Sequence, residues 1–154
     1  MVIKKIFELL EDREFISVAT CDFSGRPNVA PKFILKLESN YLYLVDYVLG
    51  TTFSNVTINP RVSISLMDID ALTGYQINGA VEIISKGEEF QRMLKELNER
   101  EVNLSVKRII EGIDTGKKHA SFEVMLPENV IILKVKIEEA VEIGPRGVLK
   151  REKL

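Results

Sequence analysis

Short stretches in which hydrophobic and polar residues alternate recur along the chain, and they predict a mainly β protein. The clearest stretch covers residues 61–68, where Val62, Ile64 and Leu66 alternate with an arginine and two serines. A period of two is typical of a strand with one buried face. The pattern predicts strands over residues 15–21, 28–37, 41–46, 61–68, 75–85, 121–126 and 130–143.

Helical spacing of apolar residues appears at the N-terminus and again in the second half of the chain. Apolar residues at positions 3, 6, 7 and 10 predict an N-terminal helix. Two more helices are predicted over residues 90–97 and 102–110, with a break at residues 98–101. Residues 51–60 are rich in β-branched and capping residues, so propensity predicts only one short turn there, capped by Thr51 or Thr52.

Closely spaced turns join the predicted strands, and no alternating pattern of strand and helix is present. Residues 22–25, 38–40 and 127–129 carry turn chemistry. This arrangement favours a closed or nearly closed antiparallel barrel over a doubly wound sheet. The chain shows no repeat and no second domain, so residues 1–154 are expected to form one domain with a polar, peripheral tail after Gly144.

Composition and charge narrow the classes of partner. The 154 residues are 45% apolar and 29% charged, as in a soluble globular protein. The formal net charge of -2 leaves no excess of positive charge for a nucleic acid or an anionic membrane surface. No apolar run is long enough to span a bilayer or to act as a signal peptide. We therefore expect no nucleic-acid partner and no membrane partner.

The chain has one cysteine, Cys21, and one histidine, His119. These cannot supply an internal disulfide or the clustered ligands of a zinc site, so a reduced, metal-free cytoplasmic protein is expected. A nucleophile–histidine pair would depend on His119, which is better explained as the entrance of a strand, and Cys21 as a small buried residue. Acidic pairs at residues 68/70 and 88/89 lack a partner motif. The catalytic residues therefore stay unknown.

No glycine-rich phosphate loop is present, so a phosphate site would have to be built in another way. Residues 48–55 offer three hydroxyls, a side-chain amide and, if a helix begins there, unpaired backbone N–H groups that would receive an anion. The alternative is that Thr51 caps a short helix and Asn55 satisfies the turn before Pro60. The residues alone favour neither interpretation.

Three segments in order, ISVATCDFSGRPNVAPKF, LGTTFSNVTINPRVSISL and LTGYQINGAVEI, resemble the FMN-binding split-barrel family that includes pyridoxamine-phosphate oxidases and small FMN-binding proteins. The resemblance runs from the first helix to about Leu97, and it depends on the order and spacing of the segments. It implies an antiparallel six- to seven-stranded split β-barrel of the Greek-key type with peripheral helices. It also implies FMN as cofactor and a homodimer with the flavin at the subunit interface.

The resemblance further implies roles for particular residues. Thr52 and Asn55 match the turn that binds the phosphate, whereas Thr51 stands where many relatives have a lysine or arginine, a loss for which Lys32 could compensate. Residues 72–76 resemble the segment beside the flavin ring, although they also read as a loop leading into a strand. Apolar walls would come from Phe33, Val48 and Leu72. The predicted cofactor-binding residues are Pro31, Lys32, Phe33, Val48, Thr51, Thr52, Asn55, Leu72, Thr73, Gly74, Tyr75 and Gln76.

By resemblance, the protein is expected to transfer electrons or hydride through FMN to a small-molecule redox substrate. Oxidation of pyridoxamine phosphate itself is disfavoured, because the basic and histidine residues for a second phosphate cannot be located. A nicotinamide-dependent flavin reductase and a deazaflavin-dependent reductase are closer rivals. A non-catalytic FMN carrier and a cofactor-free dimeric binding module stay open. Leu94, Leu97, Ile109 and Ile110 are expected to cover the barrel or the dimer interface.

Overall fold

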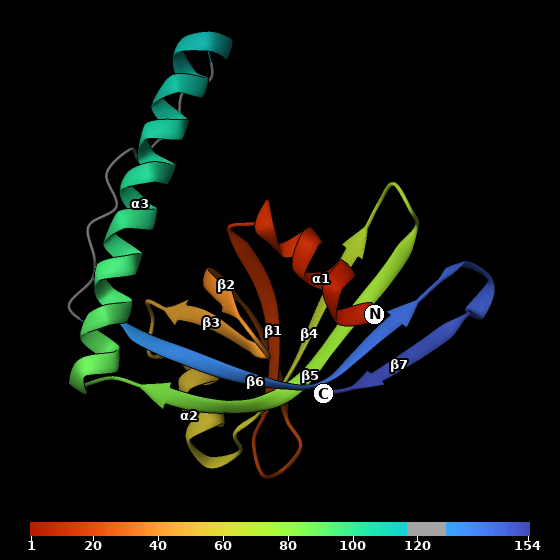
Figure 1. Ribbon diagram of the computed structural model, residues 1–154. Coiled ribbons are helices and arrows are strands. Elements are labelled where there is room, and N and C mark those ends of the chain that lie inside the picture. Colours follow the sequence, from red (N-terminus) through yellow and green to blue (C-terminus); the bar gives the residue numbers. More distant parts are fainter. Residues whose placement is uncertain (117–128) are drawn as a thin grey trace.

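The computed structural model describes residues 1–116 and 129–154. His119, the strand predicted over residues 121–126 and most of the following turn lie outside these residues. The described elements are α1 (Val2–Glu11), β1 (Phe15–Cys21), β2 (Pro27–Glu38), β3 (Tyr41–Asp46), α2 (Thr51–Ile58), β4 (Arg61–Asp68), β5 (Thr73–Ile84), α3 (Gly87–Thr115), β6 (Ile131–Ile143), a 3-10 turn (Pro145–Gly147) and β7 (Leu149–Lys153). Figure 1 shows the strands gathered into one curved sheet, with α3 along its side.

The sheet closes on itself into an antiparallel barrel. Its strand order is β3-β2-β1-β4-β5-β6, and β6 pairs with β3 again to complete the ring. The predicted six- to seven-stranded antiparallel barrel is therefore confirmed. One edge of β6 pairs with β5. Along the opposite edge, residues 131–136 pair with β3 and residues 139–143 pair with β7. The expected polar tail after Gly144 contains the strand β7, which pairs with the end of β6.

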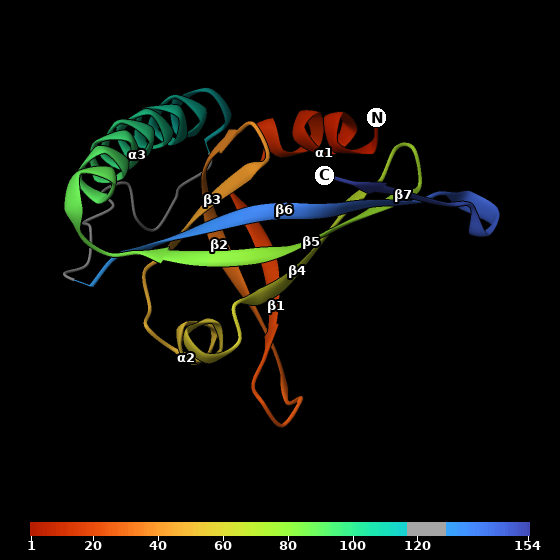
Figure 2. The ribbon, with the colours of Figure 1, turned by 60° about the horizontal axis from the view of Figure 1, so that its bottom comes forward.

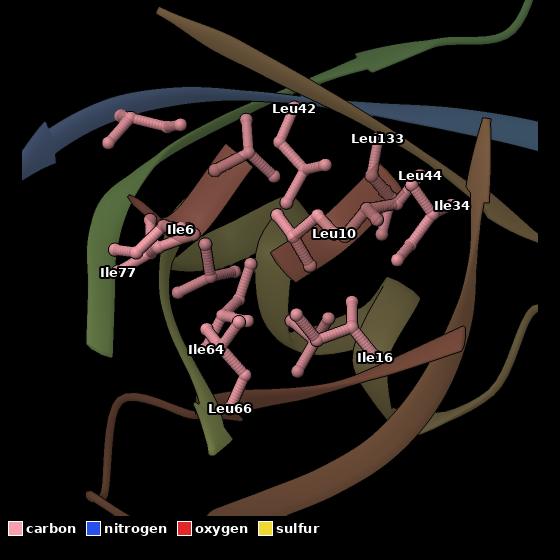
Figure 3. Packing of buried hydrophobic residues seen from close by; sticks show 14 of the residues in the cluster. Ile6, Leu10, Ile16, Ile34, Leu42, Leu44, Ile64, Leu66, Ile77 and Leu133 are labelled. Carbon is pink, nitrogen blue, oxygen red and sulfur yellow. The ribbon is translucent and has the colours of Figure 1, made fainter. Parts of the chain in front are cut away.

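Alternation along the strands separates an apolar interior from the outer surface. Ile16, Ile64 and Ile77 point into the barrel, where they meet Ile6 and Leu10 of α1 (Figure 3). Val56 of α2 joins the same cluster. The two short helices thus lie on opposite sides of the barrel and cover its two open ends (Figure 2).

A bulge in the β5–β6 ladder falls between Asn78 and Gly79. A Cβ atom at Gly79 would lie 2.2 Å from the Lys136 carbonyl oxygen, so no other residue fits without moving the backbone. Bulges shift which residues face each side of a sheet. Here the bulge sets Glu139 of β6 opposite Asn78, on the outer surface of the barrel.

Helix α2 is longer than the single turn that propensity predicts. It spans eight residues, and its N-cap is Gly50 rather than either of the threonines. Burial explains the difference, since Thr52, Asn55 and Val56 all lie on the barrel side of the helix. Tertiary contacts therefore override the weak helix propensity of its β-branched residues.

Helix α3 runs without interruption over 29 residues, so the predicted break at residues 98–101 was wrong. This stretch contains no glycine or proline, and glutamate and arginine are good helix formers. Its residues also contact the barrel: Glu101 accepts a hydrogen bond from the Tyr47 hydroxyl, and Arg100 lies over the Phe33 ring. Within the described part of the chain, neither α3 nor a shorter helix combines the length and apolar content needed to cross a membrane.

The beginning of α1 is held by the last strand. The Glu152 carboxylate accepts hydrogen bonds from the backbone N–H groups of Val2 and Ile3, at 2.6 and 3.1 Å. These donors have no partner within the helix, and a negative charge there also interacts favourably with the helix dipole. A second link joins Lys5 to the buried Glu142 at 2.6 Å, and this bond holds the pKa of the Glu142 carboxyl below its ordinary value.

Replacement of Glu152 by alanine removes the acceptor of both bonds and should destabilise the fold by about 1 kcal/mol, the usual cost of losing a helix N-cap. Urea unfolding followed by circular dichroism measures this change. The matched control is Glu82→Ala at an exposed position of β5, which should change the free energy of unfolding much less. Equal effects of the two substitutions would show that the cap contributes nothing.

Candidate functional site

The outer surface of β1, β4 and β5 carries short side chains where the interior carries large ones. This small-residue face consists of Ser17, Ala19, Ser63, Ser65, Gln76 and Asn78, which alternate with buried neighbours along their strands. Two hollows open on it. One of 410 Å³ lies beside Ala19, Ser63 and Asn78, and another of 170 Å³ lies beside Ser17 and Ser65. Short side chains therefore leave room for a flat molecule on this side of the barrel.

A single cross-strand row connects two of the predicted segments. Pro31 pairs with Ser17, Ser17 with Ser65, and Ser65 with Gln76. Three strand spacings separate the ends of this row, a span of about 14 Å. Pro31 and Gln76 thus flank the small-residue face from opposite sides, although they are far apart in the sequence.

The N-terminus of α2 lies beside the beginning of β2. The first bond within the helix runs from the Ser54 N–H to the Gly50 carbonyl, so the N–H groups of residues 51–53 precede the helical ladder, and no side chain caps them. Thr51 is exposed at this end. An uncapped helix N-terminus of this kind attracts anions.

Thr52 and Asn55 use their side chains to fasten α2 to the barrel. The Thr52 hydroxyl accepts a hydrogen bond from the Asn28 amide at 3.1 Å, and the Asn55 amide donates to the Thr20 hydroxyl at 3.1 Å. Both Thr52 and Asn55 are buried. The alternative in which Thr51 caps the helix was wrong, because Gly50 is the N-cap and no side chain caps this end. The Asn55 amide bonds to β1 instead of the turn before Pro60. The role of Thr52 and Asn55 as phosphate ligands stays a prediction.

Lys32 does not offer a free cation to a phosphate. Its ammonium group lies 2.8 Å from the Asp46 carboxylate, and both residues are buried. The same Asp46 oxygen accepts the backbone N–H of Val48 at 3.1 Å. Lys32 shares its face of β2 with Ile34, which belongs to the barrel interior. We expected Lys32 to compensate for the missing cation at Thr51, but its ammonium group is already paired with the Asp46 carboxylate.

The three predicted apolar walls do not come together. Phe33 is buried under α3, with its ring 5.5 Å from the Arg100 guanidinium, whereas Val48 and Leu72 are 71% and 64% exposed. Tyr75 points into the barrel core. Tyr75 alternates with Gln76 along β5 and therefore faces the barrel interior, away from the small-residue face. Phe33 shares the outer face of β2 with Pro31, but its ring packs in the cluster beneath α3.

In the segment 72–76, Leu72 precedes β5 and the other residues form the beginning of that strand. Leu72 has a positive φ of 50°, and the Thr73 hydroxyl donates to the Ala71 carbonyl at 3.1 Å. A Cβ added to Gly74 would make only ordinary contacts, the nearest being 3.7 Å from Ile143. Packing inside the chain therefore does not require this glycine. Gln76 is the member of the segment whose side chain lies on the small-residue face.

A line of hydrogen bonds across this face was missed by the sequence reasoning. Gln76 donates to Ser63 at 2.9 Å, Ser63 donates to Asn78 at 2.9 Å, and Asn78 donates to Glu139 at 2.8 Å. Arg151 binds the other oxygen of Glu139 at 3.1 Å. The bond from Asn78, followed by that from Arg151, lowers the pKa of the Glu139 carboxyl. Polar residues at every second position were the available signal, but alone they indicate only an outward face.

The other candidates for chemistry have structural explanations. Cys21 is half-buried, and its carbonyl accepts the Asn59 amide at 3.2 Å. Asp68 accepts the N–H of Ala71 in a turn, and Glu89 pairs with Lys134 at 3.0 Å. Residues 1–116 and 129–154 contain no group of three or more acidic, histidine or cysteine side chains arranged to hold a metal ion.

Comparison with protein families gives this arrangement its context. Residues 2–140 match the family model described as pyridoxamine 5'-phosphate oxidase. The chain belongs to the pyridoxamine 5'-phosphate oxidase family. The match includes α2 and the three strands of the small-residue face, whereas Arg151 of β7 lies beyond it. The comparison with curated proteins found no match.

Solved structures with the same fold include several members of this family. One is a Clostridium acetobutylicum protein related to general stress protein 26 of B. subtilis, with a TM-score of 0.69 and 16% identity over 99% of this chain and 94% of that one. An FMN-binding protein from Nostoc punctiforme has a TM-score of 0.59 and 14% identity, over 98% and 95%. An F420 reductase has a TM-score of 0.54 and 16% identity, over 87% and 94%. At these identities the likeness shows the fold.

The buried pair of Lys32 and Asp46 makes a stability prediction. Lys32→Met should destabilise the fold by about 3–5 kcal/mol, because it leaves the Asp46 carboxylate buried without a counter-charge. The double replacement Lys32→Met with Asp46→Leu should recover most of this loss, since two apolar side chains need no partner. Urea unfolding of both variants measures the difference. A double variant as unstable as the single one would contradict the assignment.

Proposed function

We propose that this chain is an FMN-binding flavoprotein that transfers electrons or hydride to a small-molecule substrate, as a homodimer with the flavin at the subunit interface. The observation that carries the proposal is the family match over residues 2–140. The name of the N. punctiforme structure, an FMN-binding protein of the same fold, supports FMN as the flavin. The phosphate is assigned to the N-terminus of α2, and the ring to the small-residue face.

The N-terminus of α2 fits a phosphate. It offers the uncapped N–H groups of residues 51–53, and Thr51 at this end is exposed. Thr52 and Asn55 would hold the helix in position through their bonds to Asn28 and Thr20. Because neutral N–H groups bind anions less strongly than a cation does, Thr51 in place of a basic residue would weaken the affinity.

The small-residue face fits the flavin ring. The centre of this face carries only the short side chains of Ser17, Ala19 and Ser65. The two ends of the central row are Pro31 and Gln76. A ring with an imide edge needs an apolar or flat surface and a few polar groups at its rim. Gln76 supplies the polar group, and Gly74 adds no side chain on the same face of β5.

A dimer would bring the separate segments within reach of one cofactor. Within one chain, Gln76 is two strands away from Ser17 and on the far side of the face from Pro31. A two-fold arrangement lets one subunit supply the phosphate site while the partner supplies part of the ring site. Of the four residues expected on the barrel or the interface, Leu94 and Leu97 cover the barrel, while Ile109 and Ile110 are about half exposed and available to a second copy.

When bound, FMN supplies the redox chemistry, and the protein supplies position and electrostatics. The described side chains of the small-residue face would orient the ring and keep one side of it from water. No acid or base among them is assigned to catalysis. A deazaflavin reductase is the second candidate, because the F420 reductase shares this fold, and a non-catalytic FMN carrier is the third.

The cofactor proposal is tested on protein purified without added flavin. We expect a yellow protein whose absorbance, after denaturation, is that of free FMN in a ratio of one per subunit. Anaerobic addition of NADH or NADPH should bleach the bound flavin if the protein is a reductase, whereas a carrier would stay oxidised. Protein that is colourless and binds no added FMN in equilibrium dialysis would contradict the proposal.

The phosphate assignment predicts opposite effects of two substitutions at Thr51. Thr51→Arg should tighten FMN binding about tenfold by adding one charged hydrogen bond, and Thr51→Glu should weaken it by a similar factor. Riboflavin lacks the phosphate and is the matched ligand control, so its affinity should change little in either variant. Parallel changes for FMN and riboflavin would place the phosphate elsewhere.

A further inference from the structure

The hydrogen-bond line on the small-residue face has a fixed direction. It begins at the Glu139 carboxylate, which Arg151 holds in place at 3.1 Å and which can only accept while it is ionised. Asn78 therefore turns its NH₂ group toward Glu139, at 2.8 Å, and its carbonyl oxygen toward Ser63, at 2.9 Å. Each amide has one donor end and one acceptor end, so the orientation of Asn78 follows from the charge of its neighbour.

The order of donors and acceptors continues in the same sense from Asn78 through Ser63 to Gln76. The Ser63 hydroxyl has one proton, and it gives that proton to the Asn78 carbonyl oxygen at 2.9 Å. Its oxygen can then only accept, and it accepts the Gln76 NH₂ group at 2.9 Å. The Gln76 amide is thereby fixed with its carbonyl oxygen away from Ser63. Within the described residues this oxygen forms no hydrogen bond, and one Gln76 N–H is also left for a ligand.

The line does more than join strands. The backbone ladders already set the β4–β5 and β5–β6 registers, so four polar side chains are not needed for that purpose. The bulge at Asn78 and Gly79 is what brings Glu139 opposite Asn78 and makes the line continuous. A partly buried line of this kind holds each member in one orientation, because turning either amide would set its carbonyl oxygen against another acceptor.

We infer that Glu139, Asn78 and Ser63 are positioning residues that orient the Gln76 amide to recognise the imide edge of a flavin, with the Gln76 oxygen accepting the ring N3–H. The inference rests on the proposed function and deepens it, since it names the ligand edge that this face selects. An imide edge presents an N–H between two carbonyl groups. A fixed side-by-side acceptor and donor on Gln76 complements that edge, whereas a turned amide would oppose N–H to N–H.

The test compares FMN with N3-methyl-FMN, which lacks the ring N–H, in fluorescence titrations of the full chain. The wild-type protein should bind FMN at least tenfold more tightly than the methylated analogue. Ser63→Ala frees the Gln76 amide to turn, so this ratio should fall several-fold. Ser63→Thr retains a hydroxyl and should restore the ratio. A ratio that stays unchanged in Ser63→Ala would overturn the inference.

Glu139→Gln provides a second, independent break in the line. A neutral amide at this position can face Asn78 with either end, so the direction is lost while the side-chain volume is kept. The preference for FMN over N3-methyl-FMN should decrease, whereas the adjacent Glu138→Gln, which affects the ion pair with Arg61, should leave it at the wild-type value. Thermal unfolding of each variant checks that the fold is intact. A loss of preference in Glu138→Gln equal to that in Glu139→Gln would overturn the inference.

The possible failures are distinguishable. Wild-type protein that binds FMN and its N3-methyl analogue equally would overturn the role of Gln76 and its line but leave the flavin proposal standing. Wild-type protein that binds neither flavin would overturn the proposed function, and the inference with it.

Discussion

Backbone pairing between β6 and β3 closes the sheet into a barrel, and the positions of the other elements depend on that closure. Residues 131–136 of β6 pair with β3, whereas residues 139–143 on the same edge pair with β7. Closure removes exposed strand edges and creates an interior that alternating side chains must fill. It also leaves two open ends, which α1 and α2 cover with Ile6, Leu10 and Val56. The helices are therefore a consequence of the barrel as much as of their own sequences.

This dependence links the core to the candidate phosphate site. Helix α2 has weak intrinsic propensity, and it forms because Val56 fills the barrel end while Thr52 and Asn55 bond to β2 and β1. Packing thereby holds the uncapped N-terminus of α2 at a set place on the rim. On the outer surface, the strands that fill the core with large residues present small ones. The alternation of large and small residues along the same strands thus produces both a packed interior and an outer surface of short side chains on which a flat ligand fits.

Much of the fold was predictable from local patterns, whereas the site was only partly so. The alternation of Val62, Ile64 and Leu66 identified β4, and similar patterns placed β1, β2, β3, β5 and β6 to within a few residues, whereas β7 was not predicted. The predicted break in α3 failed because Glu101 is not a solvated charge but a buried acceptor for Tyr47. Lys32 was interpreted as a free cation, because nothing near it in the sequence reveals the Asp46 carboxylate that lies across the β2–β3 ladder.

The sequence by itself determined the antiparallel barrel class, the positions of β1 to β6 and the resemblance to one family, because side-chain period and turn chemistry act over a few residues. Only the tertiary structure decided that Gln76 belongs to a line ending at Glu139 and that Lys32 pairs with Asp46. It also decided that Phe33 packs beneath α3 and that Tyr75 packs inside the barrel. The physical reason is the distance along the chain. Ser63 and Glu139 become neighbours of Asn78 only through ladder register and one bulge, and register is a property of the closed sheet.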